Sequence, residues 1–208
     1  MRSLRNIARL LAFCVAIAAG SHGGAAQDVV GKGGKTLQNR LPPGAIVELA
    51  ARPGHISIMR HALAPFDGAP PAAGSRLEDC TTQRNLDAVG RADASRIGGV
   101  LRAKGLAFEH TFTSPWCRCQ ETADLIAGRK VAVAPWLDSF FRKPENGPQQ
   151  LADLRQFVHD LPPGDRALLV THGSLILSLT GLNTAEAEIV VFVQDAWGSL
   201  QVVARGVP

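Results

Sequence analysis

The feature that most constrains this 208-residue chain is an apolar run that ends abruptly in polar residues, "RALLVTHG" at 166–173. A continuous apolar run of this length is typical of a strand in the middle of a sheet that is covered on both faces. The shorter stretch "HISIM", at 55–59, has the same character and ends on Arg60 and His61. Strand signals alternate with helical spacing along the rest of the chain. The sequence therefore predicts an α/β fold, a three-layer α/β/α sandwich around a mostly parallel central sheet.

The individual elements are expected from periodicity and from the residues that end helices. Helical spacing and stop residues such as Gly105, Gly128 and Gly164 predict four helices. The expected helices cover 86–105, 118–128, 148–164 and 174–181, and the expected strands cover 55–59, 107–114, 130–135 and 166–173. The stretches "EIVVFVQ" and "LQVVAR" predict a final hairpin.

Polar residues follow three of the predicted strands at the point where each strand ends. They are Arg60-His61 after the first strand, "TSPWCR" with Arg118 after the second, and Thr171-His172-Gly173 after "RALLV". In open α/β sheets, ligands bind beyond the carboxyl ends of the strands. We therefore expect two histidines and two arginines to meet at one edge of the sheet.

This set of side chains is suited to phosphoryl transfer. A neutral imidazole can attack phosphorus, and the phosphohistidine that forms is labile to water. Arginines bind phosphate oxygens and stabilise the charge that develops during transfer. Neighbouring cations also disfavour protonation of the histidine and keep it nucleophilic. This chemistry predicts a small phosphorylated substrate and requires no metal or other cofactor.

Four motifs in order resemble the histidine phosphatase superfamily, also called phosphoglycerate-mutase-like. They are "MRHA", "QRNLDAVGRADA", "SPWCRCQETA" and "VTHG", and the resemblance runs from about residue 45 to residue 203. The segments "SPWCRC" and "WLDSFF" look most like a small exported branch. The resemblance implies that His61 is the nucleophile, that Arg60 and Arg118 hold the phosphate, and that His172 donates to it.

The chain also departs from the pattern of that superfamily. Ala62 replaces a glycine, and alanine reaches positive φ only at a cost. Ser139 stands where many members carry a glutamate that acts as general acid. Asp138 and Glu188 are the two candidates for the missing proton donor, and Arg84 either contacts the phosphate or holds a loop.

The first 26 residues have the order of a secretory signal peptide. Three arginines precede the apolar run 10–19, and small residues up to Ala26 offer a cleavage site. The alternative is an uncleaved anchor, although the run is too short to span a membrane. The expected organisation is a signal peptide at 1–26, an N-terminal arm at 27–44 and a histidine phosphatase-like domain at 45–208. The expected location is periplasmic or secreted, with no stable membrane span after cleavage.

Cysteines and net charge narrow the partners further. An exported chain with Cys80, Cys117 and Cys119 predicts either one disulfide and a free thiol, or no disulfide. Cys117 and Cys119 are poor partners for each other, so Cys80 is expected to pair with one of them. Zinc is weakly indicated, because no CxxC or HxxxH spacing occurs. Removal of residues 1–26 lowers the net charge from +4 to +1, which argues against a nucleic-acid partner.

The sequence thus leads to two hypotheses. The first is an exported phosphatase that hydrolyses a phosphate ester through a phosphohistidine on His61. The second is a phosphate-ligand-binding or envelope-maintenance protein that keeps the same pocket with little or no turnover. A mutase fits poorly, because its substrate is cytosolic.

Overall fold

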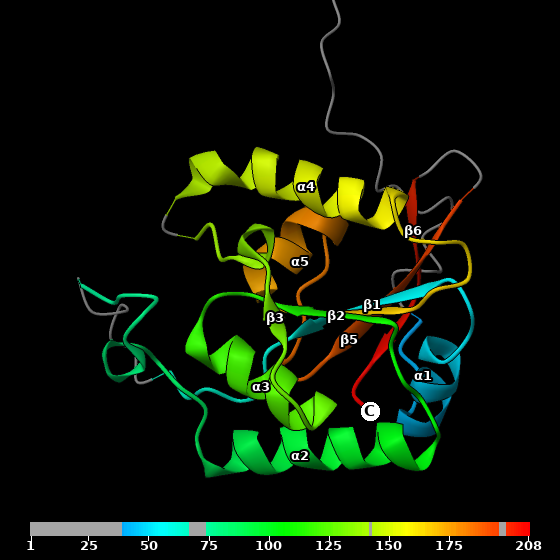
Figure 1. Ribbon diagram of the computed structural model, residues 1–208, viewed down its shortest axis with the longest axis horizontal. Helices are drawn as coiled ribbons and strands as arrows, with labels where there is room; N and C mark the ends of the chain where they lie inside the picture. Colours follow the sequence, from blue (N-terminus) through cyan, green and yellow to red (C-terminus); the bar gives the residue numbers. More distant parts are fainter. Residues whose placement is uncertain (1–38, 67–73, 142, 196–198) are drawn as a thin grey trace, which may run out of the picture.

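The computed structural model describes residues 39–66, 74–141, 143–195 and 199–208 (Figure 1). The predicted signal peptide and most of the predicted arm lie outside these residues. The helices are α1 (Pro43–Ala50), α2 (Ala88–Ala103), α3 (Cys117–Ala127), α4 (Gly147–His159) and α5 (Gly173–Thr180). The strands are β1 (His55–Arg60), β2 (His110–Thr113), β3 (Ala132–Val133), β4 (Ala167–Thr171), β5 (Ile189–Gln194) and β6 (Leu200–Gly206). Three short 3-10 helices are η2 (Cys80–Thr82), η3 (Pro135–Leu137) and η4 (Pro144–Asn146).

The six strands form one mixed sheet in the order β3-β2-β4-β1-β5-β6. Strands β1 to β4 are parallel, and β5 runs antiparallel to both β1 and β6. In the central pair Arg60 of β1 lies opposite Thr171 of β4. This register places the residues that follow, His61 and His172, side by side at the carboxyl edge of the sheet.

Alternate side chains of each central strand pack on opposite faces of the sheet. In β4, Leu168 and Val170 belong to the core that includes α1, α2 and α3, whereas Ala167 and Leu169 belong to the core that includes α4 and α5. Figure 1 shows the resulting layers, with α4 and α5 above the sheet and α1, α2 and α3 below it. The predicted three-layer α/β/α sandwich and the final hairpin are confirmed.

Several boundaries differ from those expected. Helix α1 was not predicted, and it begins at Pro43, whose fixed φ suits the first turn of a helix. The strands expected at 107–114 and 130–135 shrink to four and two residues. Helix α4 ends at His159 rather than at 164.

The last described residues of the predicted arm lie against β6. The backbone N–H of Leu41 donates to Arg205 O at 2.8 Å, and Arg40 forms a bridge with Arg205. This contact covers part of the outer edge of β6. Within the described parts of the chain, no helix combines the length and apolar character needed to cross a membrane.

Candidate active site

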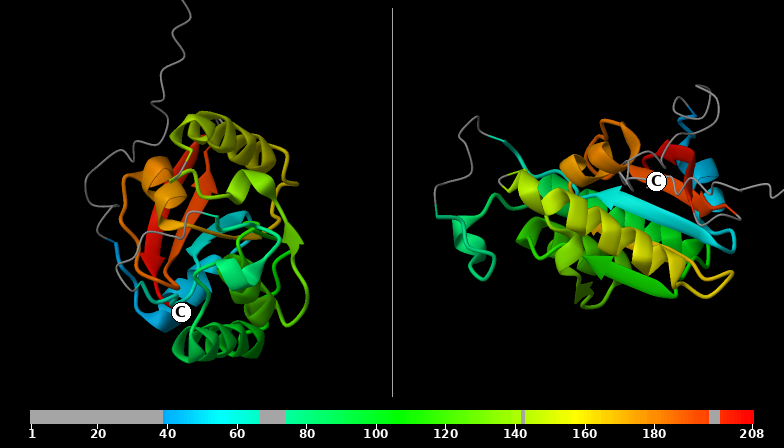
Figure 2. Two further views of the ribbon diagram at one scale, coloured as in Figure 1. Left: turned by 90° about the vertical axis from the view of Figure 1, so that its left-hand side faces the viewer. Right: turned by 90° about the horizontal axis from the view of Figure 1, so that it is seen from above.

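A cavity of about 630 Å³ opens at the carboxyl ends of β1 and β4. The arrow of β1 in the view from above points toward the end of the molecule from which the segment around η2 projects (Figure 2). The cavity is lined by residues from the ends of β1 and β4, from α3 and α5, and from the loops that connect these elements. They are Arg60, His61, Phe66, Arg84, Trp116, Arg118, Ser139, Phe141, His172, Gly173, Ser174, Leu177, Asn183 and Thr184. The four residues expected to meet, Arg60, His61, Arg118 and His172, are thus brought together.

His61 is held as a buried, neutral imidazole. Its Nδ1 lies 2.8 Å from the carbonyl oxygen of Ala62. A carbonyl only accepts, so Nδ1 carries the proton and Nε2 keeps its lone pair. Burial, followed by the positive charge of Arg118, lowers the pKa of His61 to about 3. The side chain is therefore uncharged and has one nitrogen able to act as a nucleophile.

His172 is fixed at both ring nitrogens. Arg118 Nη2 donates to Nδ1 at 3.1 Å, so Nε2 carries the proton and donates to the hydroxyl of Ser114 at 2.7 Å. Burial and the charge of Arg118 hold the pKa of His172 well below its ordinary value. The two histidine rings meet edge to face, with centroids 5.6 Å apart. In this arrangement His172 orients Arg118.

Arg118 lies in the first turn of α3 against the ring of Trp116. Its guanidinium carbon is 4.7 Å from the centre of that ring. This stacking and the bond to His172 fix the plane of the guanidinium. A cation held in this way is ready to receive an anion without further ordering.

Arg60 is fixed by the loop that precedes β5. Its Nη1 donates to Thr184 O at 2.6 Å, and its Nη2 pairs with Glu186 at 2.5 Å. The Nε atoms of Arg60 and Arg118 and the hydroxyl of Thr184 are all buried without a hydrogen-bond partner in the described structure. A buried donor without a partner is costly. All three residues line the cavity.

Arg84 also lines the cavity. Its Nη1 donates to Ala64 O at 3.0 Å, and its guanidinium lies over the ring of Phe66. The two roles expected for Arg84 are therefore compatible, because it holds the loop after β1 while it contributes positive charge to the cavity.

The two expected proton donors lie in different places. Asp138 accepts hydrogen bonds from Trp116 Nε1 at 2.5 Å and from the backbone N–H of Ser139 at 2.6 Å, both at Oδ1. Burial raises the pKa of Asp138, although these hydrogen bonds oppose the rise. Ser139, the residue at the position of the missing glutamate, faces the cavity directly.

Glu188 is not brought to the site. Its carboxylate is buried and paired with Arg205 at 2.7 Å and Arg40 at 2.9 Å. Burial alone would raise its pKa, but the bonds and charges from Arg205, Ala185 N–H and Arg40 lower it. The prediction that Glu188 is the proton donor is therefore wrong. Its carboxylate instead links residues 39–41 and β6 to the loop before β5.

The loop at Ala62 does not need the glycine that the motif usually carries. Among the described residues, the only non-glycine residue with positive φ is Ala187, at 60°. Ala62 therefore fits without strain, and its N–H donates to Thr122 Oγ1 at 3.0 Å. The strained Ala187 instead donates its N–H to His61 O at 3.1 Å, which fixes the backbone at His61.

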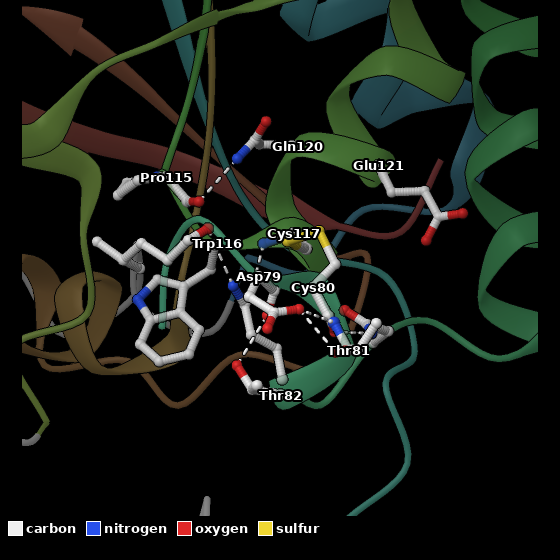
Figure 3. The surroundings of a disulfide bond; sticks show 12 residues. Asp79, Cys80, Thr81, Thr82, Pro115, Trp116, Cys117, Gln120 and Glu121 are labelled. Carbon is white, nitrogen blue, oxygen red and sulfur yellow. Dashed lines mark hydrogen bonds between the residues drawn. A yellow bond between two sulfur atoms is a disulfide. The ribbon is translucent and has the colours of Figure 1, made fainter. Parts of the chain in front are cut away.

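A disulfide between Cys80 and Cys117 joins η2 to the first turn of α3, next to Arg118 (Figure 3). This selects one of the two pairings that the sequence left open. Gln83 strengthens the link, because its Oε1 accepts from the N–H of Cys117 at 2.9 Å. Cys119 is a free thiol, fully buried, whose Sγ lies 3.5 Å from His172 Nε2.

Sequence reasoning assigned no role to Ser114, Thr122 or Phe141. Ser114 lies inside the "SPWCR" motif, so its place in the motif was the available signal. Phe141 had no signal beyond its hydrophobicity. Within the described part of the chain, no three His, Cys, Asp or Glu side chains gather in a way that would hold a metal ion.

Comparison with solved structures gives a consistent set of relatives. They include the protein histidine phosphatase SixA complexed with tungstate, at 20% identity and a TM-score of 0.53 over 73% of this chain and 95% of that one. A mycobacterial glucosyl-3-phosphoglycerate phosphatase matches at 15% identity and a TM-score of 0.53, over 74% of this chain and 99% of that one. A putative phosphohistidine phosphatase SixA from Agrobacterium tumefaciens matches at 17% and 0.50, over 75% and 99%.

These likenesses establish the class of fold. The chain has the phosphoglycerate-mutase-like fold that these phosphatases share. No protein-family model matches the sequence, and no curated protein matches it.

Proposed function

We propose that this protein is a phosphatase that hydrolyses a phosphate ester through a phosphohistidine on His61. The observation that carries the proposal is the state of His61, which is neutral, has its Nδ1 tied to Ala62 O, and lies among three arginines that line the same cavity. The similar folds of a protein histidine phosphatase complexed with tungstate and of a glucosyl-3-phosphoglycerate phosphatase support it.

The reaction runs in two displacements. His61 Nε2 attacks phosphorus, the N–P bond forms, and the ester P–O bond breaks with its electron pair on the leaving alcohol oxygen. A water molecule then attacks the phosphohistidine, which releases phosphate and returns His61 to its starting state. Arg60 and Arg118, which both line the cavity, stabilise the charge on the phosphoryl oxygens.

His172 supports the bound phosphate in two ways. While its Nδ1 is unprotonated, that atom accepts a hydrogen bond from Arg118 and holds the guanidinium in place. A phosphate dianion favours the charged form of a neighbouring imidazole. Protonated at Nδ1, His172 donates to the phosphate as the resemblance to the superfamily implies.

The first test is whether His61 is needed for turnover without metal. Purified residues 27–208 are incubated with an aryl phosphate and a chelator, and phosphate release is measured. Wild type is expected to release phosphate, and His61→Ala is expected to lose at least about 10³-fold in rate because the nucleophile is gone. Phosphohistidine is hydrolysed in acid. The reaction with radiolabelled substrate is therefore quenched in alkali, so that the labelled intermediate survives. Full activity in His61→Ala would falsify the proposal.

The proposed proton donor is Asp138. Asp138→Asn keeps an acceptor for Trp116 but removes the acid. The variant is expected to lose about 10²-fold in kcat on an alkyl phosphate, whose alcohol is a poor leaving group, and little on an aryl phosphate. A similar loss on both substrates would assign Asp138 to the positioning of Trp116 and Arg118 instead.

The second candidate function is a binding protein with little turnover. The observation that favours it is that no described residue lining the cavity carries a carboxylate. Vanadate and phosphate would then bind to wild type, as measured by calorimetry, without phosphate release from any ester in the panel.

We also propose export, with residues 1–26 removed. The Cys80–Cys117 disulfide supports this, because such bonds persist in oxidising compartments. Mass spectrometry of the mature N-terminus after fractionation of the cells tests the proposal. A chain retained in the cytoplasm with its first residues intact would contradict it.

A further inference from the structure

The mouth of the cavity carries three exposed apolar side chains. Phe66, Phe141 and Leu177 line it and are 61%, 76% and 41% exposed. They are three of the five large hydrophobic residues that are exposed within the described ranges; the other two are Val89 and Val133. We call Phe66, Phe141 and Leu177 the apolar collar. Exposed apolar side chains gathered around one opening mark a binding surface.

The collar is assembled from three separate segments. Phe66 lies in the loop after β1, Phe141 follows η3, and Leu177 lies on α5 one turn after Ser174. No single element's packing requires all three to face the same opening. Their convergence on the cavity therefore points to a ligand that touches all of them.

The collar is continuous with the cationic end of the cavity. The Arg84 guanidinium lies 5.7 Å from the centre of the Phe66 ring, and Arg84 also lines the cavity. Deeper in, Trp116 stacks on Arg118. A ligand whose phosphate sits between the arginines would place its next atoms among aromatic rings.

Part of the polar lining is already engaged in hydrogen bonds within the protein. Ser139 and Ser174 pair with each other at 3.3 Å, and Thr184 O accepts from Arg60. No described residue that lines the cavity is acidic. The cavity volume, about 630 Å³, lies within the range of about 300–1,000 Å³ of small-molecule sites and leaves ample room beyond a phosphate.

We infer that the ligand is a phosphate ester whose alcohol carries an apolar group, an aromatic ring or a hydrocarbon chain, which fills the apolar collar. This inference rests on the proposed function for the identity of the phosphate-binding end. It concerns recognition, so it is tested by binding, without turnover.

The binding experiment uses phosphonates, whose C–P bond resists hydrolysis. Benzylphosphonate and hexylphosphonate are compared by calorimetry with hydroxyethylphosphonate and inorganic phosphate. The apolar pair is expected to bind at least about tenfold more tightly, the ratio that burial of a few methylene groups or a ring supplies. Equal affinities for all four would overturn the inference.

Collar variants locate the effect. Phe66→Ser, Phe141→Ser and Leu177→Ser are each expected to reduce the apolar preference about threefold or more. Phe141→Ser and Leu177→Ser are also expected to leave the affinity for inorganic phosphate unchanged. Val89→Ser, at an exposed residue that does not line the cavity, is the matched control and keeps the full preference. A preference that survives in all three collar variants, or that falls equally in the control, would contradict the inference.

Two sources share this chemistry, a membrane lipid phosphate and a soluble aromatic or alkyl phosphate. Phosphate release is measured from vesicles that contain phosphatidate, from a soluble aryl phosphate and from glycerol phosphate. Release from the vesicles identifies a lipid source, and release from the aryl phosphate alone identifies a soluble one. Faster release from glycerol phosphate would count against the inference. Tight phosphonate binding with no release from any ester would contradict the proposed phosphatase and leave the inferred ligand intact.

Discussion

At the residue scale, burial determines the protonation state of His61. A histidine among three arginines is kept uncharged because its surroundings disfavour a further positive charge. The same condition applies to His172. Both imidazoles must therefore be neutral in the folded protein. At low pH, protonation of these histidines favours the unfolded chain.

The buried His61 predicts a loss of stability as the pH falls. In the unfolded chain it takes up a proton below about pH 6.5, whereas in the folded protein its pKa is about 3. The unfolded state thus binds more protons, and the free energy of unfolding decreases from about pH 6.5 downward. His61 alone is expected to account for about 2 kcal/mol of the loss between pH 7 and pH 5.

Denaturant titrations at the two pH values, on wild type and on His61→Gln, measure this contribution. The difference between pH 7 and pH 5 is expected to be smaller by about 2 kcal/mol in the variant. The exposed His159→Gln serves as the control for removal of a histidine. Identical pH dependence in wild type and His61→Gln would show that His61 becomes protonated in the folded protein.

At the scale of elements, α2 and α3 pack with almost no space between their backbones. A methyl group added at Gly98 of α2 would lie 2.6 Å from Ile126 O and 2.8 Å from Leu125 O, both on α3. One residue further along, a methyl group at Gly99 would meet nothing within 4 Å. The two adjacent glycines therefore have opposite roles.

Substitution of each glycine by alanine tests this packing. Gly98→Ala is expected to destabilise the protein by about 1–3 kcal/mol, because α3 must move away. Gly99→Ala is expected to stabilise it by about 0.5–1 kcal/mol, through the better helix propensity of alanine. Thermal and denaturant unfolding measure both changes. Similar effects at both positions would show that the helices adjust freely.

Helices and strands with a clear hydrophobic periodicity could be predicted from the sequence. Elements whose limits depend on contacts with other elements could not. The apolar run of β4 and the helical spacing of α2 required only the sequence. β3 shrank to two residues because it pairs only with β2, at the edge of the sheet. Helix α1 begins at a Pro-Pro-Gly segment that otherwise suggests a loop.

The site was predictable to the extent that strand ends determine it. His61 and His172 follow paired residues of two parallel strands, so their proximity follows from the topology. The hydrogen bonds from His172 to Ser114 and from Trp116 to Asp138 depend on loop geometry. Glu188 was misassigned because nothing in its local sequence reveals Arg205 and Arg40, which approach it from distant parts of the chain.

At the scale of the whole molecule, the disulfide holds the segment around η2 against the start of α3. It closes a loop of 37 residues. The loss of such a cross-link is expected to lower the free energy of unfolding by about 4 kcal/mol, through the freedom regained by the unfolded chain. Reductant should produce this loss in wild type.

The double variant Cys80→Ser/Cys117→Ser should show the same reduced stability with and without reductant. Denaturant titration under both conditions makes the comparison. Continued sensitivity to reductant in the double variant would mean that Cys119 takes part in a bridge.

The reactivity of Cys119 reports how often the folded protein opens around this residue. Its thiol is fully buried between α3 and β4, beside His172, and burial raises its pKa to about 12. It can react with an alkylating reagent only while these two elements are apart. The rate of alkylation of Cys119 therefore measures how often α3 and β4 separate next to His172. Binding of an anion between Arg60 and Arg118 should make these openings rarer and slow the alkylation, even when the anion is not hydrolysed.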